Sequence, residues 1–208
     1  MPNTPWNDRY ASGDLPWDTG EPDDNLVRFV RSGGVTPGRA LEVGCGTGTN
    51  ASWLAGQGFD VLGVDLSPLA IEKAQARLGE RALPCRFAAL DFLTGELPAG
   101  EFRFVFDRGC FHVFHEAGQR AVFAERVGKV LGPDGVWLSL IGSTEGPPRD
   151  AGPPRRSARE IVEAIEPVLE IVELRAATFQ AQGLPRSHSW VCVARRRSVP
   201  AQPSTRPA

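Results

Sequence analysis

The stretch ALEVGCGTGTN, residues 40–50, constrains the fold more than any other part of the chain. A short apolar run that contains Glu42 leads directly into three glycines, Gly44, Gly46 and Gly48. A strand that ends in a glycine turn before a helix brings backbone N–H groups and the positive helix end to one point. Glycines there adopt unusual dihedrals and leave room for a ligand against the backbone. The stretch therefore predicts a ligand loop at the end of a strand.

Further β-rich runs alternate with helix-like segments along the chain. We expect strands in residues 40–44, 59–67, 85–92, 102–109, 135–143, 169–179 and 188–196. Helical patterns occupy residues 50–57, 67–79, 119–131 and 157–165. This alternation predicts an α/β fold with a doubly wound, mostly parallel sheet. The link between the last two runs is too short for a crossover helix, so a C-terminal antiparallel hairpin should close the sheet.

The chain of 208 residues suits one domain, for which we expect residues 23–196. Residues 1–22 show no helical period, and we expect an N-terminal arm or lid there. The segment 197–208 is rich in proline and polar residues, and we expect a disordered tail.

The net charge and the cysteine pattern argue against nucleic-acid, membrane and metal partners. A net charge of −2 gives no basic field for nucleic acid. No apolar run approaches the ~20 residues that a membrane span requires. The four cysteines show neither a CxxC pair nor metal-ligand spacing, so we expect a reduced, cytoplasmic protein without a structural metal.

The glycine loop by itself fits two cofactors. Residues 46–51 satisfy the loose GxGxxG/A pattern, and Asp65 follows at about the ~20-residue offset of a ribose-binding acid, so a nicotinamide dinucleotide and S-adenosylmethionine both fit. A buried Glu42 would be costly unless it serves the turn or the ligand. Asp91-Phe92 can accept a hydrogen bond from an adenine amine and cover the ring. Because no second glycine-rich half follows, the loop favours an adenosyl group without a pyrophosphate.

The segments LEVGCGTGTN, GVDLS, ALDF and FDRG, in this order, resemble the class I S-adenosylmethionine-dependent methyltransferases. The resemblance covers residues 24–196 and implies a seven-stranded, Rossmann-like sheet. It implies that residues 44–48 lie near the methionine part of the cofactor, Asp65 on the ribose hydroxyls and Asp91-Phe92 at the adenine. The residues expected to bind S-adenosylmethionine, and its product S-adenosylhomocysteine, are Trp17, Glu42, Gly44, Cys45, Gly46, Gly48, Asp65, Leu66, Asp91, Phe92 and Asp107.

Three more segments point to one group within these methyltransferases. LPWDTGEP (15–22), FDRGCFHVF (106–114) and GPPRRSAREI (152–161) are similar to stretches of the thiopurine, thiol and halide S-methyltransferases. In that group the tryptophan region covers the cofactor, which implies this role for Trp17, and an aromatic face attracts a sulfonium by ~0.5–2 kcal/mol. Arg155 stands where those relatives tend to have an aromatic residue, so the size and charge of the acceptor stay open.

Methyl transfer mainly requires that the nucleophile and the methyl group be held together. A thiol with a pKa near ~8.5 supplies some thiolate near neutrality, so a strong base is not essential. Asp107, Arg108 and His112 are the expected catalytic residues, because they leave the fourth strand where doubly wound folds bind ligands. His112 is a candidate base, and Arg108 or Arg155 a candidate anion-binding group. A surface or packing role is the alternative for His112, and a solvated role is the alternative for Arg155 and Arg156.

We therefore expect an enzyme that methylates a small molecule, with thiols and related soft nucleophiles as the leading class. We expect no nucleic-acid or membrane partner and a monomer or weak dimer. A small-molecule N- or O-methyltransferase, a tellurite or selenium methyltransferase, and a non-catalytic S-adenosylmethionine-binding protein are the alternatives.

Overall fold

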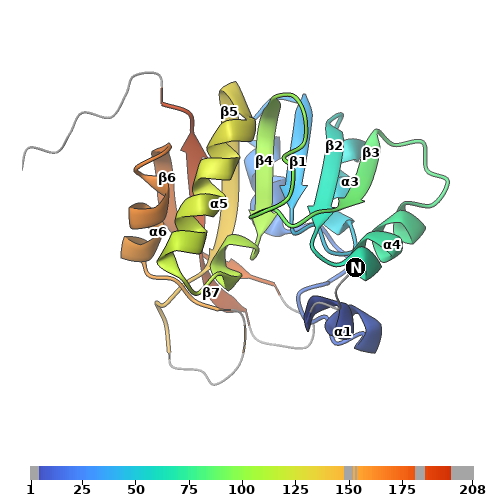
Figure 1. Ribbon diagram of the computed structural model, residues 1–208, viewed down its shortest axis with the longest axis horizontal. Coiled ribbons are helices and arrows are strands. Elements are labelled where there is room, and N and C mark those ends of the chain that lie inside the picture. Colours follow the sequence, from blue (N-terminus) through green and yellow to red (C-terminus); the bar gives the residue numbers. More distant parts are fainter. Residues whose placement is uncertain (1–4, 148–151, 153, 181–185, 198–208) are drawn as a thin grey trace, which may run out of the picture.

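The computed structural model describes residues 5–147, 152, 154–180 and 186–197. Within these ranges seven strands form one sheet in the order β3-β2-β1-β4-β5-β7-β6 (Figure 1). The strands are β1 (Arg39–Val43), β2 (Asp60–Asp65), β3 (Cys85–Ala89), β4 (Phe102–Arg108), β5 (Leu131–Gly142), β6 (Glu170–Phe179) and β7 (Ser187–Arg195). The first five pair in parallel, whereas β7 pairs antiparallel with β5 and β6. The predicted doubly wound α/β sheet with a C-terminal antiparallel hairpin is confirmed.

The helices are α1 (Pro5–Ser12), α2 (Asp24–Arg31), α3 (Thr49–Gly56), α4 (Pro68–Leu78), the short 3-10 helix η1 (Phe111–Val113), α5 (Ala117–Val130) and α6 (Ala158–Ile165). The four predicted helices, α3 to α6, begin and end close to the predicted positions. Ser67 caps α4 by accepting a hydrogen bond from the Ala70 amide, and Ser157 forms a capping box with Glu160 at α6. Local capping chemistry therefore determines where these two helices begin.

Helices cover both faces of the sheet. Along β4, Phe104 and Phe106 belong to the apolar cluster that packs against α2 and α3, whereas Val105 belongs to the cluster under α5 and α6. This alternation follows from the two-residue period of a strand. Each fully buried side chain of this size stabilises the fold by roughly 1.5–3 kcal/mol. The two apolar layers hold the carboxyl ends of β1, β2 and β4 at one edge of the sheet.

Two predictions about elements were wrong. The N-terminal arm contains a helix, α1, which lies at the lower edge of the sheet against α4 (Figure 1). The Ser67 hydroxyl donates a hydrogen bond to the Asn7 side chain there. Tertiary contacts therefore stabilise a helix whose sequence shows little helical periodicity of its apolar residues. Strand β5 begins at Leu131 instead of residue 135, because Leu131 pairs with Phe102 before a bulge shifts the register.

Part of the predicted tail, residues 198–208, lies outside the described residues, as do residues 181–185 of the hairpin link. Of the helices in the described ranges, none combines the length and the hydropathy of a membrane span.

Candidate active site

The glycine loop between β1 and α3 takes the backbone conformation that its sequence demands. Gly44, Gly46 and Gly48 have φ angles of 70°, 54° and 77°, a region that glycine enters at low cost. A Cβ atom at Gly44 would lie 2.8 Å from the Cβ of Cys110, and one at Gly48 would lie 2.6 Å from the Phe87 ring. Because both contacts are too short for real atoms, no larger residue fits at these positions.

Three consecutive amides of the loop already have partners in the protein. The N–H groups of Gly44 and Cys45 donate to the Val64 carbonyl, with N···O distances of 2.8 and 2.9 Å. The Gly46 N–H donates to Oδ2 of Asp65 at 2.9 Å. The loop thus has few amides left for a pyrophosphate, which favours the adenosyl ligand over the dinucleotide.

Glu42 lies at the floor of the cavity described below and is only 1% exposed. Its Oε1 accepts a hydrogen bond from Nδ2 of Asn50 at 3.1 Å, whereas Oε2 has no partner among the described residues. Burial raises the pKa of Glu42 to about 8, although the hydrogen bond from Asn50 opposes the shift. A cationic ligand group beside Oε2 would offset the cost of burying this carboxylate.

Asp65 ends β2 with both carboxylate oxygens turned toward backbone amides. Oδ2 accepts from Gly46 N, and Oδ1 accepts from Ser67 N at 2.9 Å. Burial raises the pKa of Asp65, and these two amide hydrogen bonds oppose the shift. Leu66, the next residue, is 42% exposed and also lines the cavity.

Asp91 and Phe92 lie on the same side of the cavity as Leu66, just after β3. The Asp91 side chain accepts hydrogen bonds from the Leu93 amide at 2.8 Å and the Thr94 hydroxyl at 2.7 Å, so it also shapes its own turn. The Phe92 ring is buried, with its centroid 5.0 Å from that of Phe123.

The N-terminal arm places three aromatic side chains at the cavity. Trp17 meets the rings of Trp6 and Tyr10 edge-on, with centroid distances of 5.8 and 6.4 Å. The Arg9 guanidinium lies 4.8 Å from the centre of the Trp17 ring. Trp17 was predicted to lie at the cofactor, whereas Tyr10 was missed because the helix that carries it was missed.

Asp18, which sequence reasoning also missed as a site residue, joins this arm to the glycine loop. Its carboxylate accepts from the Thr47 hydroxyl at 2.7 Å and from both terminal nitrogens of Arg77, at 3.2 and 3.1 Å. Burial opposes ionisation, but the hydrogen bonds from Arg77 and Thr47 outweigh it and lower the pKa of Asp18. The sequence contained a signal for this residue, since Asp18 follows Trp17 in the segment LPWDTGEP that carries the resemblance.

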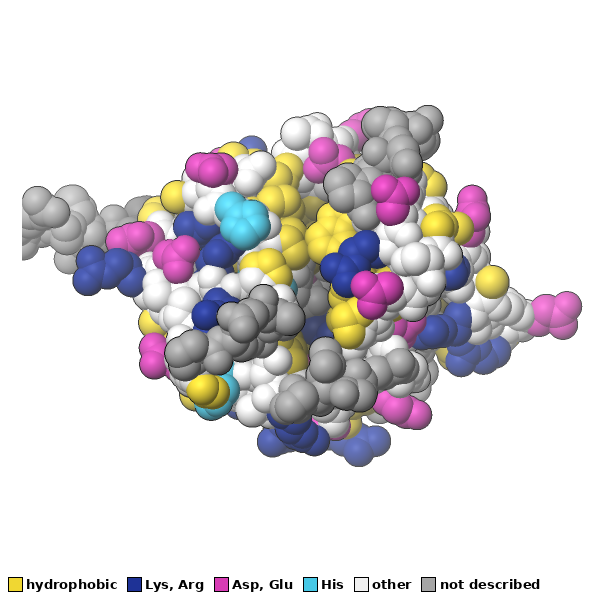
Figure 2. Space-filling view, turned by 90° about the horizontal axis from the view of Figure 1, so that it is seen from below, with side chains coloured by type: hydrophobic (Ala, Val, Ile, Leu, Met, Phe, Trp, Pro, Cys, Tyr) yellow, Lys and Arg dark blue, Asp and Glu magenta, His cyan; other side chains and the backbone are white. Residues whose placement is uncertain are grey.

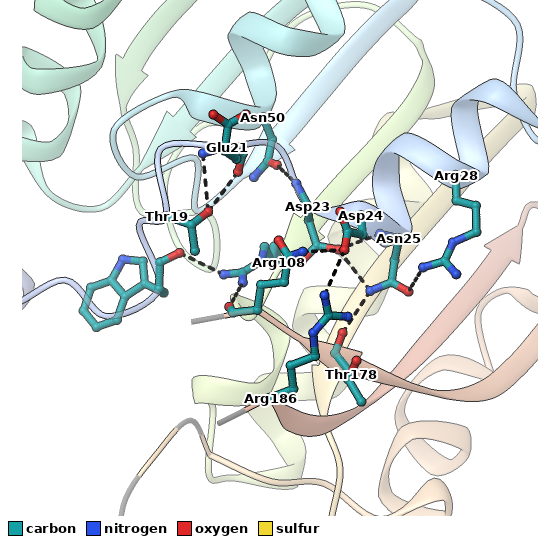
Figure 3. A network of polar contacts seen from close by, with 12 residues as sticks. Thr19, Glu21, Asp23, Asp24, Asn25, Arg28, Asn50, Arg108, Thr178 and Arg186 are labelled. Atoms are coloured by element: carbon teal, nitrogen blue, oxygen red, sulfur yellow. Dashed lines mark hydrogen bonds and ion pairs between the residues drawn. The ribbon is translucent and has the colours of Figure 1, made fainter. Parts of the chain in front are cut away.

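Arg108 stands at the centre of a polar network between distant segments (Figure 3). Its Nε donates to Oδ2 of Asp23 at 2.7 Å, and its terminal nitrogens donate to the carbonyls of Trp17 at 3.2 Å and Gln180 at 2.6 Å. The guanidinium carbon also lies 5.1 Å from the centre of the Phe179 ring. These contacts describe a group that positions the arm and the end of β6, and they leave Arg108 poorly suited to capturing an anion.

Asp107 is fully buried beneath the cavity and is not one of its lining residues. Its Oδ1 accepts from the Phe111 amide at 2.9 Å, and its Oδ2 accepts from the indole N–H of Trp137 at 2.9 Å. Burial raises the pKa of Asp107 to about 6, although the Phe111 amide opposes the shift. The geometry favours a role in holding η1 against β5 over the predicted contact with substrate or cofactor.

His112 does line the cavity, but its ring is oriented by the backbone. Its Nδ1 accepts a hydrogen bond from the Gly142 amide at 2.7 Å, so the neutral ring carries its proton on Nε2. In this tautomer the backbone already uses the lone pair of Nδ1, and Nε2 carries a proton. The geometry therefore disfavours His112 as a general base.

These residues surround a cavity of about 830 Å³ at the carboxyl edge of the sheet. Figure 2 shows this face with hydrophobic side chains around the hollow and arginine or lysine side chains beside it. The glycine loop, Asp18, Glu42, Asp65 and Asp91 form one half, which is called the cofactor half after the role proposed for it below. The other half, called the acceptor half for the same reason, is lined by His112, Phe114, Glu145, Pro147, Pro154, Arg155, Phe179, Arg186 and His188.

Arg155 and Arg156 differ in their surroundings. Arg155 lines the acceptor half. Arg156 is only 7% exposed, and its guanidinium donates to the carbonyls of Arg155 at 2.8 Å and Phe114 at 2.9 Å. The solvated alternative is therefore wrong for Arg156, because Phe114, far away in sequence, supplies its acceptor.

Comparison with known sequences decides the family. The sequence model of thiopurine S-methyltransferase matches residues 1–195. The chain belongs to the thiopurine S-methyltransferase family. It is thus an S-adenosylmethionine-dependent methyltransferase, as the cofactor motifs implied.

Individual relatives agree with this family, and a solved structure shows the same fold. The chain is 31% identical to "Probable thiol methyltransferase 2" of Arabidopsis thaliana, over 89% of this chain and 83% of the relative. It is 32% identical to "Thiocyanate methyltransferase 1" of Brassica oleracea, over 84% and 75% respectively. The crystal structure of a TehB-like SAM-dependent methyltransferase from Corynebacterium glutamicum shares the fold, with a TM-score of 0.69 and 20% identity over 94% of this chain and 100% of that one.

Proposed function

We propose that this methyltransferase moves the methyl group of S-adenosylmethionine to the sulfur of a small thiol, or to a related soft nucleophile. The family and the names of the two plant relatives, a thiol and a thiocyanate methyltransferase, support a sulfur acceptor. The observation in this chain that carries the proposal is the hydrogen bond from Gly142 to Nδ1 of His112. Because the backbone already uses the Nδ1 lone pair of His112, this ring does not supply a base. The site at the end of β4 therefore suits a nucleophile that ionises without a strong base.

The cofactor half fits S-adenosylmethionine on two observations. The unpartnered Oε2 of buried Glu42 suits a cationic group of the ligand, and the glycine loop beside it lines the cavity of about 830 Å³. We assign Glu42 and residues 44–48 to the methionine part, Asp65 to the ribose, and Leu66 with Asp91-Phe92 to the adenine. When bound, the cofactor supplies a methyl group activated by its sulfonium.

The protein contributes positioning and exclusion of water. We assign the cover of the cofactor half to Trp17 and its aromatic neighbours, which Asp18 ties to the glycine loop. Arg108 holds the backbone of Trp17 and the end of β6 on either side of the cavity. Such positioning contributes several kcal/mol to a displacement between two bound groups.

We also propose a cytoplasmic location, supported by Cys45, Cys85, Cys110 and Cys192, which are all unpaired.

The test is release of S-adenosylhomocysteine from the purified protein and S-adenosylmethionine across thiols, thiopurines, sulfide, halides, phenols and amines. We expect turnover confined to sulfur and related soft nucleophiles and greatly reduced in Asp65→Ala. Circular dichroism of the variant should show that it is folded. Turnover only with amines or phenols would overturn the sulfur assignment.

A further inference from the structure

Four arginines line the cavity within the described residues, and Arg155 is the one without a partner. Its side chain has no hydrogen bond, ion pair or ring contact with any other described residue. The other three each have a carboxylate: Arg9 pairs with Asp14 at 2.8 Å, Arg108 with Asp23 at 2.7 Å and Arg186 with Asp24 at 3.5 Å. A partly buried cation without a partner is costly unless a ligand supplies the opposite charge.

The backbone that carries Arg155 is firmly held. The neighbouring Arg156 N–H donates to the Gly142 carbonyl at 2.7 Å, and the Arg156 carbonyl accepts from the Thr144 amide at 3.2 Å and the Trp190 indole at 3.1 Å. Arg155 therefore starts from a backbone position fixed against the end of β5, whereas its guanidinium has no partner among the described residues. The fixed backbone lowers the cost of ordering this side chain on a ligand.

The protein behind Arg155 carries surplus positive charge. Arg120 and Arg156 are both buried, and each donates to the Phe114 carbonyl at 2.9 Å. Among the described residues, one acid forms an ion pair with these two arginines: Glu160 lies 3.4 Å from Arg120. Burial, and next the charge of Arg120, lower the pKa of Arg156. The field at this wall of the acceptor half therefore attracts anions.

The cavity's carboxylates lie mostly elsewhere. Those that line it in the described part of the chain are Asp18, Glu21, Glu42, Asp65, Asp91 and Glu145. Asp18, Glu42, Asp65 and Asp91 belong to the cofactor half, and Glu21 is exposed in the arm. Glu145 is the one acid from the end of β5, and it is exposed with no ion pair to Arg155. The two halves thus differ in charge.

We propose that Arg155 is a specificity-determining residue that binds a carboxylate, or a similar planar oxyanion, on the methyl acceptor at a group separate from the reacting sulfur. A guanidinium binds such groups through two parallel hydrogen bonds. Bound to the sulfur itself, Arg155 would weaken the nucleophile, so its charge is better used on a remote group. Phe114, Phe179 and Pro154 line the same half and suit an apolar, aromatic body. The assignment rests on the proposed methyl transfer to sulfur.

The test uses two thiols that differ in the remote group, 4-mercaptobenzoate and its amide, 4-mercaptobenzamide. We expect Arg155→Gln to lower kcat/KM for the carboxylate by about tenfold or more, and to change that for the amide by less than about twofold. Arg155→Lys should restore part of the loss. Arg159→Gln, an exposed arginine on α6 outside the cavity lining, is the matched control and should change neither value.

Equal losses for both thiols, or no loss for either, would overturn the assignment of Arg155 while leaving sulfur methylation intact. Binding of 4-mercaptobenzoate to the complex with S-adenosylhomocysteine, measured by calorimetry, separates the two proposals. Binding that is about tenfold weaker in Arg155→Gln, without turnover of any thiol, would support the anion site and overturn the proposed function. Equal affinity in both proteins would overturn the anion site.

Discussion

The Nε atom of Arg108 lies 2.7 Å from Oδ2 of Asp23, and this buried pair joins the end of β4 to the start of α2. The Asp23 side chain is 1% exposed and that of Arg108 13%. Asp23 also caps α2 by accepting from the Asn25 amide. One ion pair therefore connects the central strand, the first helix of the domain and the arm.

Removing Arg108 should destabilise the whole domain. Arg108→Gln leaves Asp23 buried without its partner, and breaking such a pair costs about 3–5 kcal/mol. Urea unfolding should show this loss. The matched control is Arg86→Gln, whose exposed pair with Asp60 should contribute about 1 kcal/mol or less. Equal stability of the two variants would contradict the role of Arg108.

Glu42 should make cofactor binding depend on pH. Burial raises its folded pKa to about 8, above the unfolded value, so the folded state holds a proton that the unfolded state has lost. The free energy of unfolding contains a contribution from this proton. That contribution is fully present below the unfolded-state pKa of Glu42 and is lost as the pH rises through about 8. A cationic ligand beside Glu42 favours the carboxylate, so binding of S-adenosylmethionine at pH 7 should release a proton.

Calorimetry of that binding in buffers with different ionisation enthalpies counts the released protons. Glu42→Gln keeps the size and the hydrogen-bonding capacity of the side chain but has no proton to release. In this variant, the measured binding enthalpy should therefore lose the part of its buffer dependence that comes from proton release by Glu42. Proton release of the same size in both proteins would rule out Glu42 as the source.

A methyl group added in the glycine loop should abolish cofactor binding. Gly44→Ala combines a φ of 70° with a Cβ 2.8 Å from Cys110, and strain of this kind costs about 1–3 kcal/mol. Gly118→Ala in α5 is the control, since nothing lies within 4 Å of its Cβ and alanine favours a helix by about 1 kcal/mol. Equilibrium dialysis with S-adenosylhomocysteine should show loss of binding in Gly44→Ala alone; retained affinity there would contradict a need for this loop conformation in cofactor binding.

The acceptor should determine how the rate depends on pH. Because Nδ1 of His112 accepts from Gly142, the ring does not serve as a base, and kcat/KM should rise with the thiolate fraction of each substrate. The inflection should move with the thiol pKa across a series of arylthiols and alkylthiols. An inflection common to all thiols that disappears in His112→Gln would instead identify His112 as the base. His188→Gln tests the exposed histidine that also lines the cavity.

Several residues expected at the site lie at the predicted place in the fold, but their contacts were not predicted. Asp107 and His112 leave the fourth strand as expected, yet their partners, Trp137 and Gly142, each lie 30 residues further along the chain. Arg156 looks solvated in the sequence and is buried in the structure. Periodicity reports which face a residue is on and carries no information about a partner on another strand.

The sequence alone determined the strands, the caps of α4 and α6, and the glycine turn, because each depends on residues within a few positions of one another. Gly44, Gly46 and Gly48 specify their turn through positive φ angles that glycine adopts at low cost. Only the tertiary structure decided what Arg108, Asp18 and Arg155 do. Arg108 and Asp18 meet their partners only once the fold has brought distant segments together. The same arrangement leaves Arg155 without a partner among the described residues.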